Sequence, residues 1–132
     1  MTTIDTAITI EQRVRYVECD PMGYVHHSTY PVWFEMARTE LLRRRGIAYR
    51  RLEEEGLFIV VARLNISYHQ PAKYDDVVLI TATLRRMGMA KIEHDYQVKR
   101  DGVLLATAST TLACVDRAGR PIRVPQWLGG PE

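Results

Sequence analysis

The chain has 132 residues, of which 46% are hydrophobic and 26% are charged; this is the composition of one ordinary globular domain and excludes intrinsic disorder. Eighteen basic residues against sixteen acidic ones leave a formal net charge of +2, an excess too small to indicate nucleic-acid binding. The longest apolar run, 57–62, is far shorter than the about 18 residues that cross a membrane. Residues 1–9 lack the basic start of a secretory signal. We therefore expect a single cytoplasmic domain over residues 1–132, with its core at about 8–116.

No group of residues has the spacing of a metal site. Cys19 and Cys114 lie far apart in the sequence, and the adjacent His26 and His27 form no i,i+4 pair. The two cysteines are expected to be reduced and buried, and no metal ligand is assigned.

The first half of the chain predicts a strand, a turn and two helices. Mixed alternation indicates a strand over 8–17, and Asp20-Pro21-Met22-Gly23 has the composition of a turn. A helix is expected to begin near residues 28–30, with Pro31 tolerated in its first turn, and to end before Gly46. Its apolar residues at 30, 33, 34, 37 and 41, widened by those at 32 and 36, predict a helix covered on most sides. A second, short helix is expected at about 48–55.

The chain after Gly56 predicts strands separated by turns. Residues 58–68 alternate strictly, which predicts a long strand with a dry face and a wetter face. Further strands are expected over 76–84, about 92–98 and 103–115, and Asp101-Gly102 is a strong hairpin signal between the last two. Because the helices precede the run of strands and do not alternate with it, the predicted class is α+β. One five-stranded antiparallel sheet wrapped around the long helix satisfies this order.

Asp20 is the strongest candidate for chemistry, since it ends a predicted strand shortly before the predicted helix. A carboxylate there can attack a carbonyl or deprotonate water, and the free N–H groups of a helix start can bind a developing oxyanion. Aspartate also often caps a turn. Spacing alone leaves both roles of Asp20 open.

A longer pattern surrounds Asp20 at fixed spacing: Arg13-Val14, Cys19-Asp20, Gly23, Val25, Ser28, Tyr30 and Glu35-x-Ala37-Arg38. It resembles the active-site signature of the 4-hydroxybenzoyl-CoA thioesterase family and of its YbgC-type acyl-CoA thioesterase relatives, which are hot-dog folds. The order of elements over about residues 8–116 agrees with a hot-dog domain. One departure is Tyr24, where the family usually has Ile or Val; it is expected to bear on the acyl group more than on the reaction.

The resemblance implies an acyl-CoA thioesterase that uses no metal or organic cofactor. Asp20 matches the catalytic carboxylate, acting as nucleophile or general base. His27 falls where the main-chain N–H at the helix start polarises the thioester carbonyl. The substrate pocket is assigned to four residues: Gly23, Tyr24, Val25 and Trp33. The helical spacing of Trp33 fits the core better than a ligand contact.

Two other functions stay open. A hot-dog hydratase or dehydratase would pair His27 with Glu35 or Glu40, but the signature sets its acid on the turn before the helix. A non-catalytic acyl-CoA-binding domain would need no catalytic acid. Such sensing domains usually carry a DNA-binding segment, for which the few residues before the first strand leave no room.

Assembly and acyl specificity are also expectations from the resemblance. Hot-dog domains dimerise edge to edge with their sites at the dimer interface, and exposed sheet edges need protection. We therefore expect at least a homodimer, and we favour a homotetramer. The acyl group is expected to be uncharged, because a buried charge needs a partner. The residues taken to face the pocket are apolar or aromatic: Tyr24, Trp33, Phe34 and Met36. Neither the acyl group itself nor the residues that bind the coenzyme A phosphates are assigned.

Overall fold

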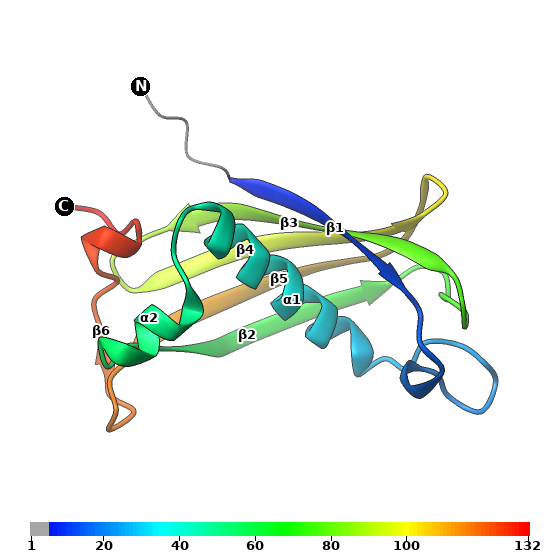
Figure 1. Ribbon diagram of the computed structural model, residues 1–132, viewed down its shortest axis with the longest axis horizontal. Coiled ribbons are helices and arrows are strands. Elements are labelled where there is room, and N and C mark those ends of the chain that lie inside the picture. The colour runs from blue at the N-terminus through cyan, green and yellow to red at the C-terminus, as the bar shows by residue number, and fades with distance from the viewer. Residues whose placement is uncertain (1–5) are drawn as a thin grey trace.

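The strands form one antiparallel sheet, and the long helix lies across one of its faces (Figure 1). The computed structural model describes residues 6–132, and its sheet has the order β1-β3-β4-β5-β2, with a short strand β6 added beside β5. The elements in chain order are β1 Ala7–Arg13, the 3-10 helix η1 Tyr16–Glu18, α1 Thr29–Arg44, α2 Tyr49–Glu54, β2 Phe58–Tyr68, β3 Val77–Met87, β4 Lys91–Arg100, β5 Val103–Val115, β6 Pro121–Ile122 and the 3-10 helix η2 Gln126–Leu128. The predicted α+β class, with five long strands and one long helix, is confirmed.

The first strand ends earlier than the sequence predicts. β1 stops at Arg13, and the main-chain groups of Val14 still bond the turn before β3, with its N–H 2.8 Å from the carbonyl oxygen of Asp76. The chain then tightens into η1, where the N–H of Cys19 donates to the carbonyl of Tyr16 at 3.1 Å. Short 3-10 turns of this kind commonly connect regular elements. The segment predicted as the end of a strand is therefore a turn that leads to Asp20.

Helix α1 has one buried face. The side chains packed into the sheet are Tyr30, Trp33, Phe34, Ala37 and Leu41. Fully burying a side chain of the size of Leu41 stabilises the fold by about 1.5–3 kcal/mol. The expectation of a helix covered on most sides is wrong, since Val32 is 52% exposed and Met36 is 37% exposed. The sheet reaches only one side of the helix, and no other described element covers the opposite side.

Two hydrophobic clusters make up the core. The larger lies between α1 and the sheet, where the ring of Phe34 stacks on that of Tyr96 with centroids 4.6 Å apart. The smaller lies under α2 and the C-terminal segment, around Leu52, Leu112 and Val124. The larger cluster supports the start of α1 and therefore the neighbourhood of Asp20.

The predicted hairpin is confirmed. Arg100 of β4 pairs with Val103 of β5, so Asp101 and Gly102 form a two-residue connection. Both have positive φ, 50° and 79°, which matches the primed turns that such hairpins favour.

Strand β2 does not have the predicted dry face. It is an edge strand, and three residues of the face expected to be dry, Val60, Leu64 and Tyr68, are 41%, 39% and 49% exposed. The reason is that α1 packs on β1 and β3, which lie toward the opposite edge of the sheet from β2. An edge strand of this length with exposed apolar side chains is unusual for an isolated chain.

Candidate active site

The segment between η1 and α1 forms a closed loop that presents Asp20. Cys19 and Val25 pair as an isolated antiparallel bridge, and the N–H of Asp20 donates to the carbonyl of Tyr24 at 2.7 Å. Gly23 closes the turn with its N–H 2.9 Å from the carbonyl of Asp20. Its φ of +81° lies in the left-handed region that favours glycine. The turn predicted at residues 20–23 is therefore confirmed.

The carboxylate of Asp20 is held through one of its two oxygens. Oδ1 accepts main-chain N–H groups of Met22 at 2.9 Å and Tyr24 at 3.1 Å, so the aspartate does stabilise the turn. Oδ2 has no hydrogen-bond partner among residues 6–132. The turn therefore fixes the group and leaves one oxygen available to a ligand.

The approach to α1 supplies a free main-chain donor. The N–H of His26 donates to the carbonyl of Glu18 at 2.8 Å, and that of Thr29 donates to the carbonyl of His26 at 2.9 Å. The N–H of Ser28 lies 3.2 Å from Nδ1 of His26. Within the described part of the chain, the N–H of His27 finds no acceptor. An N–H group at a helix start attracts negative charge.

Asp20 and His27 line the same hollow, which measures about 380 Å³, within the range of small-molecule sites. Tyr24 and Val25 of the loop and Tyr30 of α1 contribute to its wall. The rest of the lining comes from the end of β2 and the residues after it: Tyr68, His69, Gln70 and Pro71. Among the residues that the structure describes, no lysine or arginine lines it.

Other residues considered from the sequence lie elsewhere. Trp33 is fully buried and its indole N–H donates to Glu18, so it does not line this hollow. Gly23 shapes the loop and is not part of the lining. Glu35 is paired with Arg38 at 3.9 Å and lies outside the hollow. Glu40, paired with Arg43, lies outside it as well. Within the described part of the chain, this hollow therefore does not bring His27 together with Glu35 or Glu40, the acid–base pair that a hydratase would need.

Sequence reasoning missed the wall formed by Tyr68, His69 and Gln70. No local motif marks these residues, and only Pro71, as the end of a strand, stands out. They come to Asp20 because β2 pairs with β5 and ends beside the start of α1. The hydroxyl of Tyr68 donates to the carbonyl of His27 at 3.0 Å.

A separate cavity lies at the other end of α1, between the helix and strands β4 and β5. Arg38 of α1 and Arg45, which directly follows that helix, line it together with His94, which is 7% exposed. Nδ1 of His94 has no partner within residues 6–132. Burial, together with the positive charges of Arg38 and Arg45, lowers the pKa of His94 to about 4.

Two further properties bear on the class of protein. Among residues 6–132, no three or more His, Cys, Asp or Glu side chains gather in a metal-binding arrangement. No helix in that part of the chain has both the length and the apolar character needed to span a bilayer.

Comparison with known proteins agrees with this geometry. Residues 14–130 match the family model described as the thioesterase-like superfamily. The acyl-CoA thioesterase YbgC of Haemophilus influenzae is 33% identical over 93% of this chain and 92% of its own. The 4-hydroxybenzoyl-CoA thioesterase of a Pseudomonas species is 27% identical over 71% of this chain and 69% of its own. The crystal structure of a DHNA-CoA thioesterase from Staphylococcus aureus superimposes with a TM-score of 0.87 at 28% identity, covering 92% of this chain and 83% of that one.

These matches confirm the resemblance drawn from residues 13–38 and the hot-dog fold that it implied. With nearly the whole described chain matched, the protein belongs to the thioesterase-like superfamily.

Proposed function

We propose that this protein hydrolyses an acyl-CoA thioester to a free carboxylic acid and coenzyme A, with Asp20 as the reacting carboxylate. The family to which the chain belongs makes it an enzyme of the thioesterase class. The acyl-CoA substrate is inferred from its relatives, among them the YbgC enzyme.

Two routes use Asp20. In the first, Oδ2 attacks the thioester carbon, the C–S bond breaks, and the coenzyme A thiolate leaves and takes up a proton. Water then cleaves the mixed anhydride, which releases the acid and returns the carboxylate. In the second, Asp20 takes a proton from a water molecule as that water attacks, and the proton passes to the departing thiolate. Both routes consume one water molecule per thioester.

The main-chain N–H of His27 supplies the oxyanion site in either route. Charge develops on the carbonyl oxygen as the thioester is attacked, and a fixed donor at a helix start stabilises it. One observation carries this proposal: Asp20, whose Oδ2 is unpaired, and His27, whose N–H is unpaired among residues 6–132, both line the same hollow. A nucleophile and an oxyanion donor must both reach one carbonyl group.

The test is Asp20→Asn, assayed by the release of free coenzyme A with a thiol reagent. The amide oxygen of asparagine still accepts the N–H groups of Met22 and Tyr24, so the turn is kept while the nucleophile or base is lost. We expect kcat to fall by at least about 10²–10³. Asp75→Asn is a matched control on the neighbouring exposed turn and should keep wild-type activity. An Asp20→Asn enzyme with full activity would contradict the proposal.

We further propose that two copies pair along β2. This edge is eleven residues long and leaves Val61 and Leu64 exposed in the single chain, and pairing protects both the edge hydrogen bonds and these side chains. The hollow adjoins the end of β2, so the second copy would complete its outer wall. A tetramer would require a second contact between such dimers. A cytoplasmic location is proposed because the substrate is an acyl-CoA and both Cys19 and Cys114 are free thiols.

A further inference from the structure

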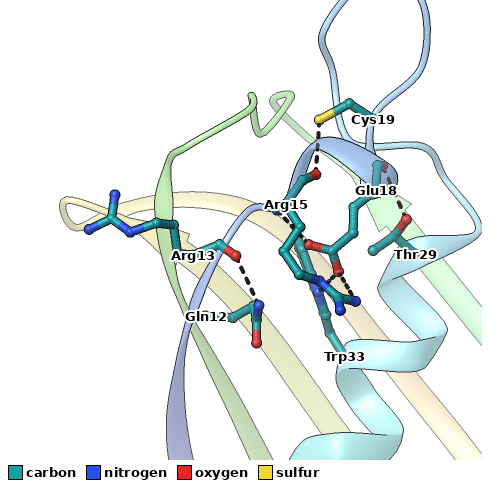
Figure 2. Close-up of polar contacts among 7 residues, drawn as sticks. All are labelled: Gln12, Arg13, Arg15, Glu18, Cys19, Thr29 and Trp33. Atoms are coloured by element: carbon teal, nitrogen blue, oxygen red, sulfur yellow. Dashed lines mark hydrogen bonds and ion pairs between the residues drawn. The ribbon is translucent and has the colours of Figure 1, made fainter.

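Glu18 is the one buried acidic residue in the described part of the chain, 5% exposed, and it stands two residues before Asp20. Oε1 accepts the main-chain N–H of Arg15 at 2.8 Å. Oε2 accepts the indole N–H of Trp33 at 2.9 Å and a guanidinium N–H of Arg15 at 3.3 Å (Figure 2). Each oxygen of this carboxylate therefore has a donor.

These donors keep Glu18 ionised. Burial alone would raise its pKa, because a carboxylate loses solvation, but the hydrogen bonds from Arg15 and Trp33 and the charge of Arg15 hold the pKa below its usual value. An ionised carboxylate is an acceptor at both oxygens. The ionised form therefore matches the three donors around it without a proton of its own to place.

The main chain of Glu18 also forms hydrogen bonds with residues at and just before the start of α1. Its carbonyl accepts the N–H of His26 at 2.8 Å and the hydroxyl of Thr29 at 3.2 Å. Figure 2 shows the side chain directed at Trp33 and the carbonyl at Thr29, both on α1. One residue thus joins the turn that leads to Asp20 with the helix start that carries His27, at two points of the helix.

We propose that Glu18 is a positioning residue that sets the separation between the carboxylate of Asp20 and the N–H of His27. This inference rests on the proposed function of those two groups. Glu18 does not line the hollow, so it acts through the geometry of the loop and does not touch the substrate. Loss of the bond to Trp33 would leave Glu18 joined to the helix start only through its carbonyl, which binds the N–H of His26 and the hydroxyl of Thr29. A displacement of about 1 Å at a reacting group can cost about 10²-fold in rate.

The first variant is Glu18→Gln, which keeps the volume of the side chain. Glutamine offers one acceptor and one NH₂ donor, so its NH₂ group must face an N–H of Arg15 or Trp33. We expect kcat to fall about 10–100-fold with a change in KM below about threefold, since the geometry of reaction changes and the lining of the hollow does not. Trp33→Phe removes the same hydrogen bond from the other side. The double variant should lose little more than the worse single variant, because one shared contact is broken in each.

One control and one further test variant separate positioning from general destabilisation. Val124→Ala creates a small cavity in the distant cluster and should lower Tm while kcat stays at the wild-type value. Thr29→Val removes one donor to the Glu18 carbonyl at nearly constant volume, and it should lower kcat about three- to tenfold even if the other two variants fail to fold.

Wild-type kcat in a folded Glu18→Gln or Thr29→Val enzyme would overturn the proposal. The proposal would also be overturned if the losses of kcat were additive in the double variant that combines Glu18→Gln with Trp33→Phe. A loss of kcat in Val124→Ala as large as that in Glu18→Gln would overturn it too. The proposed function fails separately, if Asp20→Asn keeps its activity. A loss of kcat in Glu18→Gln beside an active Asp20→Asn enzyme would mean that Glu18 positions some group other than Asp20, which also overturns the inference.

Discussion

The hydroxyl of Tyr68, at the end of β2, donates a hydrogen bond to the main-chain carbonyl of His27 at 3.0 Å. The same ring meets that of Tyr30 edge to face, with centroids 5.1 Å apart. The edge strand is thus tied to the helix start that carries the proposed oxyanion donor. A molecule that binds along β2 would therefore also affect the position of the candidate site.

The first prediction concerns assembly through β2. Val61→Lys sets a charge on the apolar surface of this strand, where the residue is 50% exposed in the chain, so the subunit should fold while pairing is lost. A buried unpaired charge costs several kcal/mol at an interface, so light scattering should give a smaller assembly than the wild type. We expect kcat/KM to fall about tenfold or more, because the second copy would no longer complete the outer wall of the hollow.

Val103→Lys is the matched control, because Val103 is also an exposed strand valine, 41% exposed, but lies at the β4–β5 hairpin. It should keep the wild-type mass and activity. A wild-type protein that is monomeric by light scattering and fully active would contradict the proposed dimer.

The second prediction ranks Asp20→Asn against His27→Ala. Alanine at position 27 keeps the main-chain N–H, so kcat should fall only about tenfold, through the orientation of the thioester or water, while Asp20→Asn loses about 10²–10³. Both are measured with one acyl-CoA that the wild type accepts. The reverse ranking, with His27→Ala inactive, would make the imidazole the base and favour a hydratase-like arrangement.

The third prediction concerns the acyl group. The wall of the hollow includes three aromatic rings, those of Tyr24, Tyr30 and Tyr68, and among residues 6–132 no lysine or arginine contributes to it. A carboxylate on the acyl chain would lie near the carboxylate of Asp20 without a compensating cation, and the repulsion between the two negative charges is unfavourable. Hexanoyl- and benzoyl-CoA should therefore exceed malonyl- and succinyl-CoA in kcat/KM. The opposite order across this panel would show that the acyl group binds elsewhere.

The fourth prediction is a pH dependence of stability caused by His94. Its pKa is about 4 in the folded chain against 6.5 for an ordinary histidine, so the unfolded chain binds a proton between these values and the folded chain does not. The contribution of His94 to stability is complete above about pH 6.5 and is lost as the pH falls toward 4. The loss between pH 7.5 and 4.5 is about 2.5 kcal/mol.

The variant His94→Phe removes this titration and keeps an aromatic ring beside Tyr96, whose centroid lies 6.0 Å from that of His94. Urea unfolding at fixed protein concentration gives the free energy of unfolding for both proteins at each pH. The wild type should lose about 2.5 kcal/mol more than the variant. Parallel losses in the two proteins would mean that His94 titrates normally in the folded state.

Local signals were enough for most of the fold. The spacing of apolar residues, Pro31 and Gly46 predicted α1 to within about a residue at its start, and Asp101-Gly102 predicted the hairpin. Both features depend on contacts between residues near in sequence, which periodicity and turn composition report directly.

Features that depend on distant segments were not predicted. The alternation of β2 indicated a dry face, but the position of α1 on β1 and β3 decides which strands are covered. Glu18 stands in the sequence as an ordinary charged residue, and its burial follows from the indole of Trp33, 15 positions later. The wall formed by His69 and Gln70 likewise depends on where β2 ends in space.

The order of the sheet also separates early contacts from late ones during folding. Strands β3, β4 and β5 follow one another along the chain and pair through short connections, so they can form with a small loss of loop entropy. β1 and β2 join this meander only by long-range pairing, such as Ala7 with Thr83 and Phe58 with Val115, which is intrinsically slower. Every residue of the hollow lies outside the meander. We therefore expect the geometry of the candidate site to be completed last, on a sheet whose centre is already formed.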